Sequence, residues 1–252
     1  MDIIRGATQL AHAADTPLSR AAADCLVVAF YFLLRPGEYM GSPKTTSDDL
    51  FRFQDVGLWI GGRQLNTASC PLADLQAATF ATLSHLHFPE NGIRGEKISH
   101  SRSGHPTLCP VLCLISRIIY LRLYNASPTT PLNATLVSGT AVRWSYLQPA
   151  AITSFLRAAV VLAPDLGILP SDVSARSTRA GGAMAMMCAG IDCDRIRLIG
   201  RWRSDEMYRY LHVQAQPVMN GVATAMFRGG HYRLTPGLLP PNDFPTLPAP
   251  PP

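Results

Sequence analysis

The strongest constraint on the fold is a run of ten consecutive apolar residues, Cys25 to Leu34. A helix that spans a membrane needs about 20 apolar residues, so this run is too short for one. Thr16-Pro17 lies upstream and is typical of a helix start, because threonine can cap the first turn and proline suits it. Pro36-Gly37 ends the helix and leaves Arg35 and Glu38 at its rim. The run predicts a helix buried on all sides at the centre of a domain.

The composition allows a large core and an anionic partner. The chain has 252 residues, of which 47% are hydrophobic and 15% charged, and its net charge is +5. Lys44 and Lys97 are its lysines, and every other basic residue is arginine, which binds phosphate through a planar fork. The six cysteines form no Cys-x-x-Cys pair, so we expect a reducing compartment, with Cys25 and Cys188 as buried apolar side chains.

The pattern of residues changes from β-like to helical along the chain. Strand-like pieces are Phe51-Arg52-Phe53, 56–60 and 79–88, and Glu90-Asn91-Gly92 is typical of a hairpin turn. A loop is expected over 127–140, and helices are expected over 111–124, 145–162, 178–189, 193–199, from Ser204 onward, and over 218–227. These elements predict an α+β fold, mainly α, in which a helical bundle carries a small antiparallel sheet.

The chain is expected to consist of three parts. Residues 1–216 form the main domain, 217–234 a C-terminal helix, and 235–252 a proline-rich tail that cannot build a core and is predicted to be disordered. The start, Met1 to Arg5, lacks the long apolar core of a signal peptide. We therefore expect an intracellular protein that does not enter a membrane.

Basic residues gather near the end of the main domain. Between positions 176 and 209 seven arginines stand against four acidic residues, an excess of three positive charges. The arginines are Arg176, Arg179, Arg195, Arg197, Arg201, Arg203 and Arg209. Arginine-rich codon usage would explain the composition of the whole chain but not this clustering.

The order of residues within this cluster indicates a reaction. Arg176-Ser177-Thr178-Arg179 is followed by Gly200-Arg201-Trp202 and then by Tyr210. A phosphodiester is an anion, so an enzyme that attacks it must neutralise its free oxygens and place a hydroxyl in line. Two arginines and a tyrosine can do this without a metal, through a covalent phosphotyrosine. The small residues 180–183 leave the helix start bare, which would let a phosphate come close.

From about Leu18 to Gln214 the chain resembles the catalytic domain of the tyrosine recombinase (phage integrase) family, as found in eukaryotic mobile elements. The resemblance rests on the strings 33–38 (Leu-Leu-Arg-Pro-Gly-Glu) and 200–205 (Gly-Arg-Trp-Arg-Ser-Asp), and on the His-x-x-Arg box of the family, which falls on 176–179. It implies the tyrosine recombinase fold, cleavage and rejoining of DNA through a 3′-phosphotyrosyl link, no cofactor, and action as an oligomer, expected to be a tetramer on double-stranded DNA. It also implies a nuclear location if the protein is eukaryotic.

The resemblance assigns roles residue by residue. Arg35, Arg176 and Arg179 would hold the phosphate, and Tyr210 would be the nucleophile in preference to Tyr208. The third box falls on Arg201 or Trp202, and we favour Trp202 because its indole N–H can donate to a phosphate oxygen. Further contacts to DNA are expected from Arg195, Arg197, Arg201 and Arg203.

One position departs from the family pattern. The family has a lysine in a hairpin turn as proton donor to the leaving oxygen, but here Glu90 adjoins the Asn91-Gly92 turn. Lys97 is the lysine that follows, and we assign it as the candidate general acid. The family also usually has an N-terminal DNA-clamping domain, whereas this sequence starts almost at the matched region, as a fragment, a degraded gene copy or a stand-alone catalytic module would.

Two other classes of function remain open. A protein that binds DNA without cutting it, either a decayed recombinase or a helix-turn-helix-like module over 183–203, would use the same arginines. A protein-interaction role would use helix 218–227 and the tail. His85, His87, His100 and His105 lie near the hairpin, but they lack the spacing of a zinc site, so we predict no metal.

Overall fold

The computed structural model describes residues 1–41, 50–84, 97–137, 143–212 and 215–229. The chain divides into two compact units, Met1–His212 and Val213–Pro252. The predicted Glu90-Asn91-Gly92 turn, His85, His87 and the tail from residue 230 lie outside the described residues. The predicted boundary between the C-terminal helix (217–234) and the tail (235–252) therefore stays a prediction.

The first unit is mainly helical. Its helices are α1 (Asp2–Ala13), α2 (Pro17–Tyr31), α3 (Pro36–Tyr39), α4 (Leu72–Ala77), α5 (Pro110–Leu123), α6 (Pro149–Val161), α7 (Ser177–Cys188) and α8 (Cys193–Gly200). Its 3-10 turns are η1 (Phe53–Asp55), η2 (Pro164–Leu166), η3 (Pro170–Asp172) and η4 (Asp205–Tyr210).

Within the described ranges the strands form two antiparallel sheets. They are β1 (Val56–Ile60), β2 (Arg63–Gln64), β3 (Phe80–Ser84), β4 (Lys97–Ser101), β5 (Ala134–Val137) and β6 (Arg143–Tyr146). The larger sheet has the order β2-β1-β3-β4, and β5 pairs with β6. A mainly helical α+β fold with a small antiparallel sheet is therefore confirmed.

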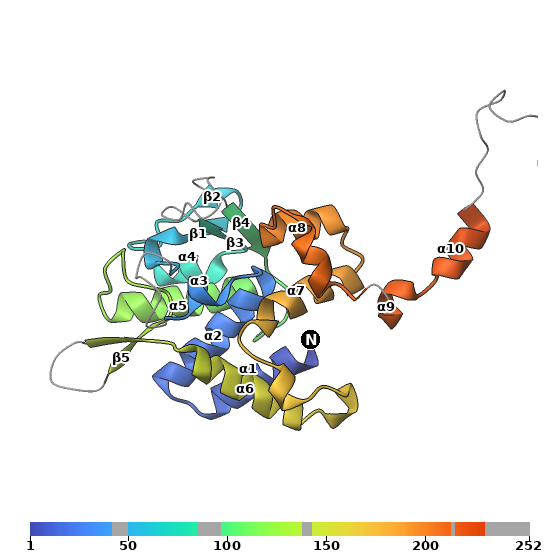
Figure 1. Cartoon of the computed structure of the whole chain (residues 1–252). Coiled ribbons are helices and arrows are strands. Elements are labelled where there is room, and N and C mark those ends of the chain that lie inside the picture. Colours follow the sequence, from blue (N-terminus) through green and yellow to red (C-terminus); the bar gives the residue numbers. More distant parts are fainter. Residues whose placement is uncertain (42–49, 85–96, 138–142, 213–214, 230–252) are drawn as a thin grey trace, which may run out of the picture. The chain divides into compact units, whose positions relative to one another are not determined.

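Helix α2 is the centre of the first unit, as the apolar run predicted. The Thr16 hydroxyl accepts a hydrogen bond from the Ser19 backbone N–H, the Ser19 hydroxyl accepts one from the Thr16 backbone N–H, and Pro17 starts the helix. Helix α2 packs against α1, α5, α6 and α7. In Figure 1 the four-stranded sheet lies on one side of α2, while α1 and α6 lie on the other.

Several predicted elements differ from the structure. The expected loop 127–140 contains β5, which pairs with β6, so the helix expected from residue 145 begins only at Pro149. Arg52 makes an isolated bridge with Pro131 instead of belonging to a strand. The segment after Ser204 is a 3-10 turn, and Cys188 is exposed. Helix α1 was not predicted at all.

The second unit contains, within its described residues, α9 (Gln216–Met219) and α10 (Val222–Gly229). The sequence predicted one helix over 218–227. The break falls at Asn220-Gly221, where Gly221 has a φ of 77°, a conformation that glycine adopts without strain. Among the described residues no helix combines the length and the apolar character that crossing a membrane would require.

The core beside α2 contains a buried carboxylate. Asp24 on α2 accepts a hydrogen bond of 2.7 Å from the Ser116 hydroxyl on α5. Burial raises the pKa of Asp24 to about 6, and the nearby Arg117 guanidinium opposes this rise. Since the folded-state pKa lies above the unfolded value, the folded state binds a proton more tightly, and stability is lost as pH rises through about 6.

We expect Asp24→Asn to become more stable than the wild type as pH rises. The difference in free energy of unfolding should grow between pH 4 and pH 7, to on the order of 2 kcal/mol, because the variant has no carboxylate to ionise. Urea unfolding at several pH values measures it. Asp165→Asn on exposed η2 is the control and should show no such growth. A constant difference for Asp24→Asn would contradict the prediction.

Candidate functional site

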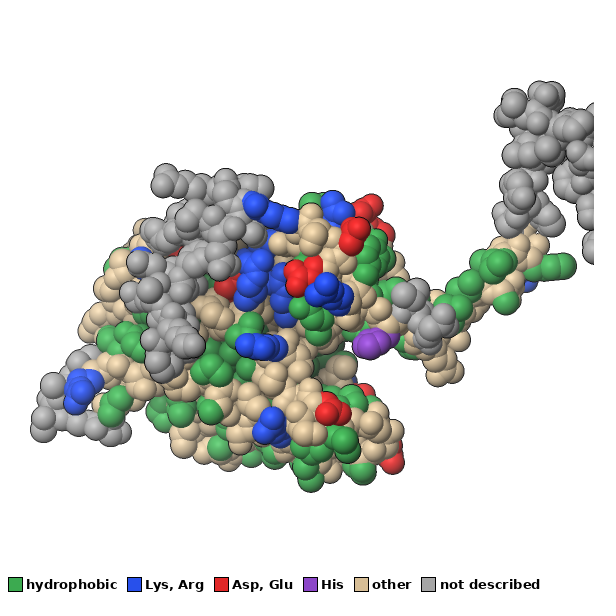
Figure 2. Space-filling view, viewed as in Figure 1, with side chains coloured by type: hydrophobic (Ala, Val, Ile, Leu, Met, Phe, Trp, Pro, Cys, Tyr) green, Lys and Arg blue, Asp and Glu red, His purple; other side chains and the backbone are tan. Residues whose placement is uncertain are grey.

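A pocket of about 330 Å³ joins three distant parts of the chain. Its lining consists of Arg35, Pro36, Arg176, Arg179, Trp202, Glu206 and Tyr210. Five of the six residues predicted as catalytic are therefore neighbours in space, although they come from the turn after α2, the start of α7 and the segment from α8 to η4. Figure 2 shows basic side chains gathered near the middle of the face in view, with acidic side chains among them.

Arg35 begins the short helix α3 and is held by Glu38. The Arg35 backbone N–H donates to Glu38 Oε2 at 2.6 Å, and the Arg35 guanidinium lies 3.5 Å from Oε1 of the same carboxylate. The Arg35 side chain is about one third exposed, so its guanidinium can still meet a ligand. Glu38, expected at the rim, is instead buried.

Arg179 is buried and fixed between two parts of the chain. Its Nη1 donates to the carbonyl of Leu33 at 2.8 Å, and its Nη2 donates to the carbonyl of Gly200. Burial lowers its pKa to about 10, and the nearby Arg35 charge adds to this shift, so Arg179 is still protonated at neutral pH. The guanidinium carbon also lies 4.2 Å from the centre of the Trp202 ring, a cation–π contact.

Arg201 does not occupy the position that the sequence suggested. It was expected on a DNA-contacting surface, but its side chain is 2% exposed and its Nη2 donates to Glu38 Oε2 at 2.8 Å. Arg201 ends α8 in the left-handed conformation, with a φ of 58°, and this turn directs the side chain inward. The assignment of Arg201 as a DNA contact is therefore wrong, because the guanidinium is used to pair a buried carboxylate.

Trp202 both lines the pocket and packs in a second core cluster. The cluster contains Leu33, Ala183, Ile196, Trp202, Met207 and Leu211. The Trp202 ring lies so close to Gly200 that a Cβ at position 200 would be 1.7 Å from it, so only glycine fits there. The ring centre of Tyr210 is 6.0 Å from that of Trp202. Trp202 thus positions Arg179 and Tyr210 by packing. This role does not depend on which atom the indole N–H contacts.

Tyr39 joins the early segment to the start of α7, and the sequence analysis missed it. Its hydroxyl lies 3.1 Å from the carbonyl of Ala175 and 3.1 Å from the Thr178 hydroxyl. Burial raises the pKa of Tyr39, which keeps this hydroxyl protonated. Tyr39 directly follows Glu38, so a tyrosine next to the Arg-Pro-Gly-Glu string was the signal that the sequence offered.

The small residues of α7 serve packing. A Cβ at Gly182 would lie 2.2 Å from the Phe30 carbonyl oxygen, so glycine allows α7 to approach the end of α2. Gly182 and Ala183 are buried there. The expectation that residues 180–183 together leave the helix start bare for a phosphate is therefore wrong for these two, because they face α2.

The two candidate tyrosines differ in position. Tyr210 is partly buried at the end of η4 and lines the pocket, whereas Tyr208 is 52% exposed and is not part of the lining. Met207 and Leu211, both buried, hold η4 against the second core cluster on either side of these residues. Tyr210 also lines a second cavity, of about 310 Å³, together with His212, Phe30 and other mostly apolar residues.

The remaining predicted residues lie outside the pocket. Lys97 is exposed at the first position of β4, paired with Ser84 of β3, and is not part of the pocket lining. Arg195, Arg197 and Arg203 are exposed on α8 and just after it. His100 donates to the Tyr31 carbonyl at 2.7 Å, and the His105 ring accepts from the Leu108 backbone N–H. Among the described residues no three metal-binding side chains meet.

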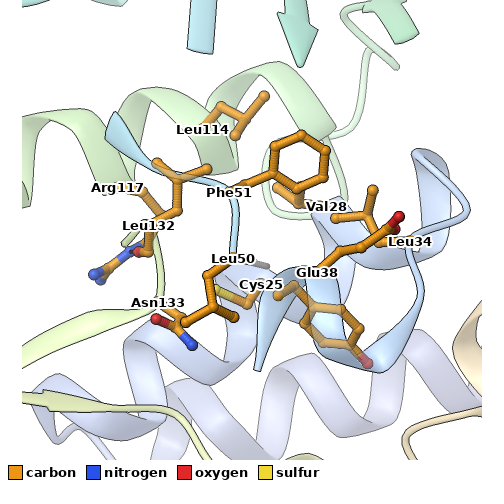
Figure 3. Close-up of a pocket in the computed structure, with 11 residues that line it drawn as sticks. Cys25, Val28, Leu34, Glu38, Leu50, Phe51, Leu114, Arg117, Leu132 and Asn133 are labelled. Atoms are coloured by element: carbon orange, nitrogen blue, oxygen red, sulfur yellow. Dashed lines mark hydrogen bonds between the residues drawn. The ribbon is translucent and has the colours of Figure 1, made fainter. Parts of the chain in front are cut away.

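The core behind the pocket is closed. Glu38 also borders a cavity of about 10 Å³, which Figure 3 shows with Leu34, Arg117 and Asn133 around it. Arg117 is buried and donates hydrogen bonds to the carbonyls of Leu132 and Ala134. A space this small admits no ligand larger than a water molecule. Glu38 thus connects this closed core to Arg35, which lines the site pocket.

Comparison with known proteins gives no family assignment. No protein-family model matches the chain, and no curated protein matches it.

The geometry suits an anion. Three guanidinium groups, of Arg35, Arg176 and Arg179, line a pocket together with a phenol and a carboxylate. A guanidinium group can bind two oxygens of a phosphate or carboxylate at once. A phenol that lines the same pocket can act as a nucleophile. The pocket can therefore hold a singly charged phosphodiester next to a hydroxyl.

We expect the Glu38–Arg201 pair to behave as a buried ion pair. Glu38→Gln should lower the free energy of unfolding by about 3–5 kcal/mol, because it leaves the Arg201 guanidinium buried without a countercharge. Adding Arg201→Met should restore part of this loss by removing that charge. Urea unfolding of the two single variants and the double variant measures the effect.

The control is Asp192→Asn, which weakens an exposed pair between Asp192 and Arg195 at 3.8 Å. It should cost less than about 1 kcal/mol. The prediction fails if Glu38→Gln and Asp192→Asn lower the free energy of unfolding equally. It also fails if adding Arg201→Met to Glu38→Gln lowers it further.

Proposed function

We propose that the chain binds double-stranded DNA and cleaves and rejoins one strand through a phosphotyrosine at Tyr210. The observation that carries the proposal is the common pocket of Arg35, Arg176, Arg179 and Tyr210, which are up to 175 positions apart in the sequence. Distant guanidinium groups that converge next to a phenol match the requirement of a phosphodiester, whose charge must be neutralised before a hydroxyl can attack.

In the proposed reaction the arginines hold the two free oxygens of the phosphate. The Tyr210 oxygen attacks phosphorus, an O–P bond forms, and the bond from phosphorus to the 5′ oxygen breaks. The phosphotyrosyl link keeps the energy of the broken bond for rejoining. The resemblance assigns the proton for the leaving oxygen to Lys97, but Lys97 lies outside the pocket lining, so we do not assign it that step.

The proposed partners are double-stranded DNA and further copies of the chain. Rejoining strands between two duplexes needs more than one nucleophile, which supports the oligomer that the resemblance implies. The specific family and a tetrameric state belong to the same proposal.

A trapping experiment tests the cleavage proposal. The substrate is a pool of DNA duplexes with a randomised central segment and a nick, because loss of a short fragment at the nick prevents rejoining. We expect the full chain to form a protein–DNA complex that resists SDS, and Tyr210→Phe to form none, since it lacks the attacking oxygen.

Tyr208→Phe is the matched control and should trap DNA like the wild type. Each variant must unfold at the wild-type temperature for the comparison to count. Trapping that survives in Tyr210→Phe, or that disappears in Tyr208→Phe, would refute the assignment of the nucleophile.

Binding of DNA without cleavage is the second candidate function. Arg195, Arg197 and Arg203 are exposed on or near one short helix, where they can contact phosphates without Tyr210. The position of Lys97 outside the pocket lining is the observation that supports this second function.

The two functions share a salt-dependent contact with DNA that can be measured separately. Replacing Arg195, Arg197 and Arg203 by Gln should reduce the slope of log affinity against log salt by about 2 to 3, because each phosphate contact contributes about 0.9. Fluorescence anisotropy with a labelled duplex measures the slope. The control replaces Arg5, Arg20 and Arg63, also exposed, and removes the same charge. Equal slopes for both triple variants would argue against a defined DNA-contacting surface.

A further inference from the structure

Glu206 is the unexpected member of the pocket lining. A carboxylate that shares a pocket with three guanidinium groups repels a bound phosphate. Glu206 lies in the first turn of η4, where the Ser204 hydroxyl accepts a hydrogen bond of 3.4 Å from its backbone N–H. Its side chain is exposed, so packing does not explain its place. A residue that weakens binding of the substrate calls for a role in the reaction.

The proton of the attacking hydroxyl needs an acceptor. When the Tyr210 oxygen bonds to phosphorus, its proton must leave. The guanidinium groups of the lining and the indole of Trp202 carry hydrogen-bond donors only, and Pro36 has no proton to exchange. Of the side chains that line the pocket, Glu206 is thus the one that can take a proton from Tyr210.

We infer that Glu206 is a catalytic residue that accepts the Tyr210 proton during strand cleavage. This inference rests on the proposed function. In the cleavage step the Tyr210 O–P bond forms, the phenolic proton passes to the Glu206 carboxylate, and the bond to the 5′ oxygen breaks. The 5′ oxygen takes a proton from solvent water, which is left as hydroxide. In rejoining, the protonated Glu206 returns its proton to the leaving phenolic oxygen.

The charge on Glu206 changes in the direction that favours the transition state. Before the step the carboxylate is negative and opposes the phosphate. As it takes up the proton it becomes neutral, so the pocket gains positive charge while negative charge grows on the phosphate oxygens. The repulsion therefore destabilises the bound substrate more than the transition state. This difference lowers the activation barrier of the step.

This role makes binding and reaction respond in opposite directions to one substitution. Glu206→Gln removes the negative charge and the proton acceptor but keeps the size of the side chain. We expect tighter binding of nicked DNA and a covalent step slower by about 100-fold or more. If Glu206 only carried a surface charge, Glu206→Gln would tighten binding without slowing the reaction.

The experiment measures two quantities on the full chain with the trapping substrate. Anisotropy gives the affinity for nicked duplex DNA, and quenched single-turnover reactions give the rate of formation of the SDS-resistant complex. The matched control is Asp205→Asn, which removes the same charge from the neighbouring residue outside the pocket lining. It should leave the rate unchanged. His212→Gln tests the histidine of the second cavity that Tyr210 lines.

The pH dependence gives a second reading. With Glu206 as acceptor, the wild-type rate should be nearly constant between pH 7 and 9. In Glu206→Gln the rate should rise by about tenfold per pH unit, because hydroxide replaces the carboxylate as base.

The possible outcomes separate the two proposals. Trapping by the wild type with a slow, pH-dependent Glu206→Gln supports both. Trapping by the wild type with an unchanged rate in Glu206→Gln, or with a loss in His212→Gln instead, overturns the role of Glu206 and leaves cleavage by Tyr210 standing. No SDS-resistant complex with the wild type overturns the proposed function and this inference with it.

Discussion

The buried carboxylate of Glu38 is the interaction on which the pocket depends. It accepts from the backbone N–H of Arg35 and from the guanidinium of Arg201, and the second contact joins residues 163 positions apart. A carboxylate away from water is strongly destabilising unless it is paired, so the turn after α2 must meet the end of α8. Arg179 strengthens the same junction, because it donates to carbonyls on both segments, those of Leu33 and Gly200. The pocket exists because these two segments are held together.

The junction divides the arginines by task. Arg201 is buried in its ion pair with Glu38. Arg179 donates to the backbone with two of its five N–H groups. Arg35 and Arg176 are more exposed and therefore more accessible to a ligand. Two residues at the junction, Leu33 and Arg201, adopt left-handed conformations, with φ of 50° and 58°. Such conformations cost on the order of 1 kcal/mol or more for residues other than glycine. The strain is tolerated because it turns the Leu33 carbonyl toward Arg179 and the Arg201 side chain toward Glu38.

Local patterns in the sequence were reliable where one element decides its own structure. The cap at Thr16, the apolar length of α2 and strand β1 were all predicted, because hydrogen bonds within the element and a single apolar pattern specify them. The hairpin of β5 and β6 was missed, since Ala134–Val137 lies in a stretch rich in Pro, Thr and Asn, and only its pairing with Arg143–Tyr146 makes it a strand. Helix ends were misplaced for the same reason, as at Pro149.

The sequence by itself determined which side chains could form an anion pocket, because the order of arginines, the Gly-Arg-Trp string and Tyr210 can be read directly from it. It also determined a buried helix α2 and an α+β, mainly helical fold. Only the tertiary structure decided that Arg201 is buried, that Tyr39 ties α3 to α7, and that Glu206 faces the same pocket as Tyr210. The physical reason is that burial and charge pairing depend on neighbours more than a hundred residues away, and the pattern around one residue does not record them.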